Sequence, residues 1–197
     1  PIVLETMVWT GESLLRANPL RNDPSIRVRA ALATSLARFE GAATKTALKV
    51  VGSLLEDASP VVRAAALATL MESSDTAGLH EFARVWPSTA LDVRFELRAD
   101  PRAEALTERL ATLLTTSTET SLRRAAVTAM GALASSGVEE RLAPALQDPS
   151  PDVRIAAIQA LAALDLPSAR ARIAQMASDP DVSVREAARR SVVRTVG

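Results

Sequence analysis

The sequence predicts an all-α fold, a right-handed α-α superhelix (solenoid) of about six stacked helix pairs. The first observation is a motif, clearest from Asp148 to Leu161 (DPSPDVRIAAIQAL), whose near-copies recur along the whole chain. The second is the nearly constant interval between the copies, which is typical of repeats built from two helices. The third is composition. Hydrophobic residues make up 48% of the chain but aromatic residues only 3%, which favours close helix packing over a β-sandwich or barrel core.

The motif itself predicts a turn that leads into a helix. Asp148, Ser150 and the two neighbouring prolines favour a turn, because proline fixes φ and a short polar side chain can cap the free N–H groups of a first helical turn. From Val153 to Leu161, apolar residues then recur at helical spacing and form a narrow, alanine-rich stripe. Another helix can approach such a stripe closely.

Six copies of the motif are visible, and each contains one arginine at the same place. The spacings between these arginines are 34, 31, 29, 31 and 31 residues, and the arginines are Arg29, Arg63, Arg94, Arg123, Arg154 and Arg185. The position six residues before the arginine is aspartate in four copies (Asp23, Asp57, Asp148, Asp179) and serine in two (Ser88, Ser117). The spacing predicts a single repeat domain over 1–197, with repeats at approximately 1–39, 40–74, 75–100, 101–136, 137–166 and 167–197.

Each repeat is expected to contain a first and a second amphipathic helix. The apolar spacing predicts first helices at 3–17, 43–55, 76–86, 101–115, 138–147 and 168–178. It predicts second helices after the turns, within 23–39 and at 60–72, 119–134, 151–164 and 181–195, with a shortened third one that ends near Asp100. Asp100 is expected to cap the next helix, with Pro101 at its first position.

The pattern of aspartate, Val-Arg reached six residues on, and Ala-x-x-Ala-Leu resembles HEAT repeats. The short period looks most like the bacterial subgroup called PBS-lyase HEAT-like repeats. The resemblance covers essentially the entire chain and implies the fold. It implies much less about function, because repeat scaffolds host many roles.

Composition excludes several kinds of chemistry. The chain has no cysteine and one histidine, His80, so disulfides and thiolate metal sites are excluded and a metal centre or an activated nucleophile is not expected. No glycine-rich phosphate loop occurs, and we expect no cofactor and no catalysis. The net charge of zero argues against nucleic-acid binding.

The sequence also bears on location. No apolar run is long enough for membrane insertion, and we expect a cytoplasmic protein. Because the chain begins with proline, we expect it to be processed or part of a larger chain.

The arginine column allows two interpretations. In the structural one, each arginine bonds turn carbonyls and the aspartate of its own or a neighbouring repeat, which links successive units. In the other, the column binds anions. The structural interpretation is the stronger, and it assigns the links to Asp23, Arg29, Asp57, Arg63, Arg94, Arg123, Asp148, Arg154, Asp179 and Arg185.

The leading functional hypothesis is a non-catalytic scaffold that binds a partner helix or peptide on a concave face made by the second helices. The positions one and five residues after each arginine share a helical face away from the core stripe: Ala30, Thr34, Ala64, Ala68, Phe95, Ala99, Arg124, Thr128, Ile155, Gln159, Glu186 and Arg190. Phe95 either anchors the partner or fills space beside the shortened helix. Trp9 and Trp86 are interpreted as core residues rather than stacking platforms. The resemblance leaves two alternatives: a bilin lyase or chaperone subunit of phycobiliprotein assembly, and a HEAT-like DNA-binding protein.

Overall fold

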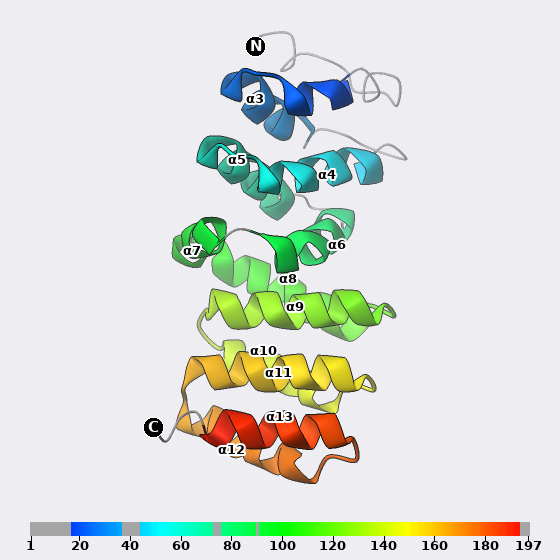
Figure 1. The fold of residues 1–197 in the computed structure, drawn as a ribbon, viewed down its shortest axis with the longest axis vertical. Helices are drawn as coiled ribbons and strands as arrows, with labels where there is room; N and C mark the ends of the chain where they lie inside the picture. The colour runs from blue at the N-terminus through cyan, green and yellow to red at the C-terminus, as the bar shows by residue number, and fades with distance from the viewer. Residues whose placement is uncertain (1–16, 37–43, 73–75, 90, 194–197) are drawn as a thin grey trace. The chain divides into compact units, whose positions relative to one another are not determined.

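The protein is all-α. The computed structural model describes residues 17–36, 44–72, 76–89 and 91–193, and within these ranges every regular element is a helix and no strand occurs. The predicted fold class is confirmed at this level, while the right-handed course of the superhelix stays a prediction. The chain divides into two compact units, unit 1 over Pro1–Glu96 and unit 2 over Leu97–Gly197 (Figure 1).

Unit 1 contains the second helices α3 (Ile26–Leu36) and α5 (Pro60–Glu72), and most of α7 (Leu91–Ala99), which crosses the boundary between the units. Its first helices are α4 (Thr44–Ser53) and α6 (Thr76–Val85), and 3₁₀ turns occupy η1 (Asn18–Asn22), η3 (Leu54–Glu56) and η4 (Trp86–Ser88). Helix α3 packs against α5, and α4 packs against α6. The helix expected at 3–17 lies almost entirely outside the described residues.

Unit 2 contains three helix pairs. The second helices are α9 (Thr120–Leu133), α11 (Pro151–Leu164) and α13 (Val182–Val193), and they lie side by side in Figure 1. The first helices are α8 (Ala103–Thr116), α10 (Val138–Leu142) continued by η5 (Ala143–Gln147), and α12 (Pro167–Gln175) continued by η6 (Met176–Ser178). The core between the two layers is aliphatic and includes the fully buried Leu110, Met130, Leu142 and Ile158.

The turns differ from expectation in how they are held. Ser150 stands at the N-cap of α11 but its side chain makes no capping hydrogen bond. Instead, Asp148 Oδ1 accepts the N–H of Ser150 at 2.9 Å. An aspartate carboxylate reaches a backbone N–H two residues on without strain, so it satisfies the turn before the helix starts. The same contact recurs at three other turns, where Asp23, Asp57 and Asp179 are the acceptors.

The expectation that Asp100 caps α8 with Pro101 at its first position is wrong. Helix α8 begins at Ala103, and Arg102 is its N-cap residue. Asp100 Oδ1 accepts the N–H of Arg102 at 2.8 Å, and its carboxylate also pairs with the Arg102 guanidinium. The carboxylate that was expected to cap the helix therefore forms its hydrogen bonds within the turn that precedes the helix.

Candidate functional site

Arg123 in unit 2 shows how an arginine of the column connects two repeats. Its Nη1 donates to the carbonyl oxygens of Ser117 at 3.2 Å and Thr118 at 3.1 Å, in the turn before its own helix. Its Nε and Nη2 donate to Asp148 Oδ2 at 2.8 Å and Oδ1 at 3.0 Å. Asp148 belongs to the next repeat. The guanidinium thus forms a bidentate pair with a carboxylate, the geometry that best matches its planar fork of N–H groups.

The same arrangement occurs at Arg154 and Arg29. Arg154 donates to the Asp148 carbonyl at 2.8 Å and to both carboxylate oxygens of Asp179 at 2.9 Å. Arg29 donates to the Asp23 carbonyl at 2.7 Å and to the Asp57 carboxylate at 2.7 and 3.0 Å. In all three pairs the guanidinium donates to backbone carbonyl oxygens of its own turn and to the aspartate side chain of the following repeat.

Burial and hydrogen bonding act in opposite directions on these carboxylates. The pKa of Asp57 lies below its ordinary value, chiefly because Arg29 donates to the carboxylate. Burial would raise the pKa of Asp148 and of Asp179, but the hydrogen bonds from Arg123 and Arg154, together with backbone N–H groups, outweigh it and lower both pKa values. The three aspartates therefore stay ionised at neutral pH.

The other arginines of the column have different partners. Arg63 donates to the carbonyl oxygens of Asp57 at 2.8 Å and Ala58 at 3.0 Å. Arg94 donates through Nη2 to the carbonyls of Trp86 and Pro87, and its guanidinium lies 5.1 Å from the centre of the Trp86 ring.

Trp86 occupies the core of unit 1. It is 0% exposed, and its ring centre lies 5.4 Å from that of Phe82. This burial agrees with the core interpretation of Trp86, while Trp9 lies outside the described residues.

The sequence analysis missed a second set of contacts between repeats, on the first helices of unit 2. Arg141 pairs with Glu108 at 2.7 Å, and Arg172 pairs with Glu139 at 3.0 Å. Both links span 33 residues, because each arginine reaches back to a glutamate of the preceding repeat. That direction is opposite to the Arg–Asp pairs. The regular spacing of Glu108 with Glu139, and of Arg141 with Arg172, each 31 residues, is the signal that could have found them.

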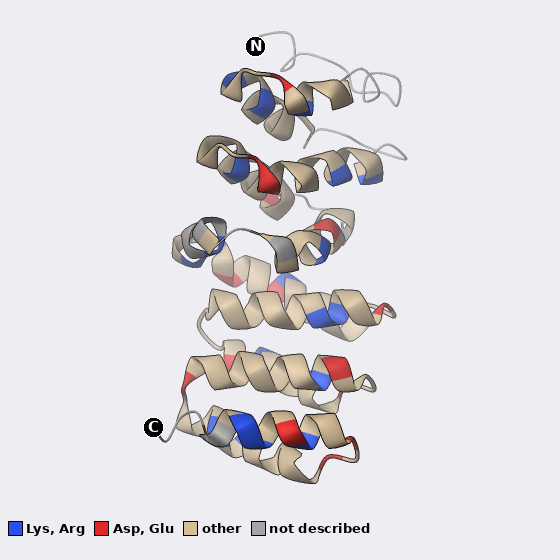
Figure 2. Cartoon of the chain, in the orientation of Figure 1, with Lys and Arg blue, Asp and Glu red and all other residues tan. Residues whose placement is uncertain are grey.

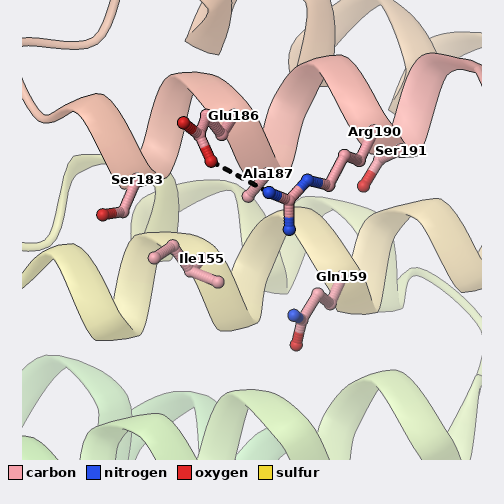
Figure 3. A pocket seen from close by; sticks show the side chains of 7 residues that line it. All are labelled: Ile155, Gln159, Ser183, Glu186, Ala187, Arg190 and Ser191. Atoms are coloured by element: carbon pink, nitrogen blue, oxygen red, sulfur yellow. Dashed lines mark hydrogen bonds and ion pairs between the residues drawn. The ribbon is translucent and has the colours of Figure 1, made fainter.

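A pocket of about 440 Å³ opens between α11 and α13 on the second-helix face of unit 2. Figure 3 shows Ile155 and Gln159 projecting from α11, with the remaining lining residues on α13. Within the pocket Arg190 Nη2 donates to Glu186 Oε2 at 2.9 Å. The full lining is Ile155, Gln159, Ser183, Glu186, Ala187, Arg190 and Ser191.

This pocket brings together four of the positions chosen from the sequence: Ile155, Gln159, Glu186 and Arg190. It adds Ser183, Ala187 and Ser191, which sequence reasoning missed because only two positions per helix were considered. These three residues follow one another at four-residue steps and therefore form a stripe on α13.

The remaining candidate positions lie elsewhere. Arg124 and Thr128 are exposed on α9 of unit 2. On α5 of unit 1, Ala64 is exposed and Ala68 is half-buried. Phe95 falls in α7, but its side chain lies outside the described part of the structure.

The described surface shows charges of both signs on the second-helix face of unit 2 (Figure 2). Among the described residues, no group of three or more histidines and carboxylates is placed to hold a metal ion. The helices in those ranges are also too short or too polar to cross a membrane.

Comparison with known proteins identifies the family of the chain. A family profile for HEAT repeats matches residues 16–97 and 107–192. No curated protein matches the chain. Similar solved structures include human deoxyhypusine hydroxylase with bound glycerol, at 18% identity and a TM-score of 0.42, covering 99% of this chain and 88% of that one. A designed armadillo repeat protein shares 16% identity at a TM-score of 0.47, over 93% and 100% of the two chains. An engineered protein shares 20% identity at a TM-score of 0.40, over 93% and 96%. With the family profile matching most of its length, the chain belongs to the HEAT repeat family.

Proposed function

We propose that this protein is a non-catalytic scaffold whose second-helix face in unit 2 binds a segment of a partner protein as a helix or an extended peptide. The observation that carries the proposal is the pocket between α11 and α13. Neighbouring second helices in a helical repeat protein form a continuous surface, and such surfaces are what these proteins use to hold partners.

The chemistry of the pocket suits a peptide. Ile155 is half-buried and offers an apolar contact for one side chain of the partner. Around it, Gln159, Ser183 and Ser191 provide amide and hydroxyl groups that can hydrogen-bond to a peptide backbone. An apolar anchor surrounded by polar groups is the common arrangement of a protein interface.

The alternative functions gain no specific support from the described residues. A DNA-binding face needs a positive stripe, whereas the second helices of unit 2 carry the exposed acidic residues Asp152 and Glu186 as well as Arg124 and Arg190, and Glu186 pairs with Arg190. The finer resemblance to PBS-lyase HEAT-like repeats, and with it a bilin lyase or chaperone role, stays a prediction from the motif period alone.

Peptide selection tests the proposal without a known partner. A random dodecapeptide library displayed on phage would be selected on the immobilised protein, and an enriched peptide measured by fluorescence anisotropy. Ile155→Glu places a charge in the apolar part of the pocket and should weaken binding by tenfold or more. Ala163→Glu is the matched control, because it introduces the same side chain at an exposed position of α11 outside the pocket.

The expected result is that peptides are enriched, that Ile155→Glu loses their binding and that Ala163→Glu retains it. Failure to enrich any peptide would overturn the proposal. So would peptides that bind the parent and Ile155→Glu equally well.

A further inference from the structure

The pocket between α11 and α13 follows the axes of the two helices. Its lining residues recur at four-residue steps, Ile155 and Gln159 on α11 and Ser183, Ala187 and Ser191 on α13. The row on α13 is about 12 Å long, because an α-helix rises about 1.5 Å per residue. The labelled residue numbers increase in the same direction along both helices in Figure 3, so α11 and α13 run parallel to each other.

The shape and polarity of the pocket favour a helical occupant over an extended one. An extended segment would cross this length in about four residues and bring about eight main-chain N–H and C=O groups. The neutral polar residues of the lining are Gln159, Ser183 and Ser191, which are too few to pair with them. A helix satisfies its own main-chain groups, and its side-chain rows at four-residue steps pack between rows that have the same step.

The two charged residues of the lining, Glu186 and Arg190, lie one helical turn apart on α13. Their side chains are 53% and 80% exposed, and Arg190 Nη2 donates to Glu186 Oε2. An exposed pair of this kind contributes little stability by itself, so both groups can also pair with a partner. The order of the pair, acidic before basic by four positions, is the order that helices favour.

The same preference in a partner helix fixes the direction of that helix. If both helices have the acidic residue before the basic one, opposite charges face each other only when the helices are antiparallel. The acidic residue of the partner then faces Arg190, and its basic residue, four positions later, faces Glu186. The dipoles of α11 and α13 favour the same direction, because an antiparallel helix brings ends of opposite partial charge together.

We propose that the pocket binds an α-helix of a partner protein that lies antiparallel to α11 and α13. Its acidic residue pairs with Arg190, its basic residue four positions later pairs with Glu186, and an apolar side chain on the same face contacts Ile155. This inference rests on the proposed function, since it concerns the occupant of the same pocket. It adds the conformation of the bound segment, its direction and the order of its charges.

A peptide enriched on the immobilised protein is the probe for conformation and direction. Bound to the parent, the ¹³C-labelled peptide should show helical Cα chemical shifts. The chain has no cysteine, so Asp152→Cys and Ala163→Cys each introduce a single thiol, near opposite ends of α11. A peptide with a C-terminal cysteine should form a disulfide about tenfold faster with Asp152→Cys than with Ala163→Cys, because the local thiol concentration is higher there. An N-terminal cysteine should reverse this preference.

Exchange of the two charges tests their order. The double variant Glu186→Arg with Arg190→Glu should bind the original peptide about tenfold more weakly, because like charges then face each other. A peptide in which the acidic and basic residues are exchanged should regain the lost affinity. Arg189→Glu is the control, because it changes a charge at an exposed position of α13 outside the pocket, and it should bind the original peptide like the parent.

The outcomes separate this inference from the proposed function. Failure to enrich any peptide overturns both. Peptides that require Ile155 for binding support the proposed function, but they overturn the helical, antiparallel arrangement in four cases. These are enriched sequences without an acidic residue four positions before a basic one, extended chemical shifts in the complex, disulfides in the opposite sense, and a double variant that binds the original peptide as tightly as the parent does.

Discussion

The two units connect their repeats to different extents. Unit 2 has two consecutive Arg–Asp pairs, from Arg123 to Asp148 and from Arg154 to Asp179. Its first helices add three Arg–Glu pairs that run in the opposite direction, from Arg141 to Glu108 and from Arg172 to Glu139 and Glu140. In the described part of unit 1, one Arg–Asp pair links two repeats, from Arg29 to Asp57. At the third copy, Ser88 stands at the position of the aspartate, and Arg94 lies over the ring of Trp86.

This difference shows how one residue changes the way a repeat is held. Where aspartate precedes the arginine by six residues, the turn both receives the preceding arginine and orients its own first N–H groups. In the third copy, where Ser88 replaces it, the rings of Phe82 and Trp86 pack together in the core. Arg–Asp pairs therefore link two repeats wherever the following copy has the aspartate, and the third repeat buries an aromatic pair in its first helix.

The largest expected effect is from Trp86→Ala. The side chain is fully buried, so its removal should leave a cavity and cost about 3–5 kcal/mol of folding free energy in unit 1. Calorimetry should show a lower melting temperature for the part of the transition that belongs to unit 1. Leu91→Ala is the control because Leu91 is 69% exposed, and it should change stability by less than about 0.5 kcal/mol. Equal melting temperatures for the two variants would contradict aromatic packing as the main support of this repeat.

The next effect is from breaking a pair in unit 2. Arg154→Ala leaves the buried Asp179 carboxylate and the Asp148 carbonyl without their donor, and should cost about 1–3 kcal/mol. Chemical denaturation followed by circular dichroism measures the change. Thr128→Ala, on the exposed face of α9, should stay within about 0.5 kcal/mol of the parent. If both variants unfold at the same denaturant concentration as the parent, the arginine column is not structural and the anion-binding interpretation regains support.

A smaller effect is expected at Gly52 and Gly131, two buried glycines within helices. A Cβ at Gly131 would lie 2.5 Å from Ala160 Cβ and 2.9 Å from its Cα, so Gly131→Ala must move a backbone. The atoms nearest to a Cβ at Gly52 belong to the Glu81 side chain, with Oε1 at 2.4 Å, and a side chain can move more easily than a backbone. Overpacking costs about 1–3 kcal/mol, partly offset by the helix preference of alanine. Gly131→Ala should therefore destabilise the protein, and Gly52→Ala should be close to neutral; the reverse order in denaturant midpoints would refute this reasoning.

Much of the fold was predictable because the spacing of apolar residues reports directly on helices. The second helices of unit 2, predicted at 119–134, 151–164 and 181–195, begin and end within two residues of the observed bounds. The 3₁₀ turns that close the first helices were not predicted, since the change from α to 3₁₀ geometry leaves the apolar pattern unaltered.

The site was less predictable than the fold. The column of arginines was visible, but the sequence allowed the aspartate partner to be in the same repeat or a neighbouring one, and only the packing of helices decides between them. Ser183 and Ser191 were missed because a small hydroxyl on an exposed helix face has no pattern of its own; its part in the pocket depends on the neighbouring helix α11.

The smallest expected effect is a difference in acid sensitivity between the units. In the folded protein the pKa values of Asp57 in unit 1, and of Asp100, Asp148 and Asp179 in unit 2, lie below their ordinary values. A carboxylate with a lowered folded pKa contributes stability above its unfolded pKa of about 3.9, and loses that contribution as the pH falls through the folded pKa. Between about pH 5 and pH 2, unit 2 should lose more stability than unit 1, because the described residues include three such groups in unit 2 and one in unit 1.

Tryptophan fluorescence separates the units, since Trp9 and Trp86 both belong to residues 1–96, while circular dichroism reports on the helices of both. On acidification the circular dichroism midpoint in denaturant should fall further than the fluorescence midpoint. Asp148→Asn provides the control. It should destabilise unit 2 at pH 7, where the parent carboxylate is ionised and paired with Arg123. The difference in unfolding free energy between the parent and this variant, the gap, should narrow as acid protonates the parent. A gap that stays constant down to pH 2 would mean that the charge of Asp148 contributes nothing, and that shape and hydrogen bonding alone hold the pair.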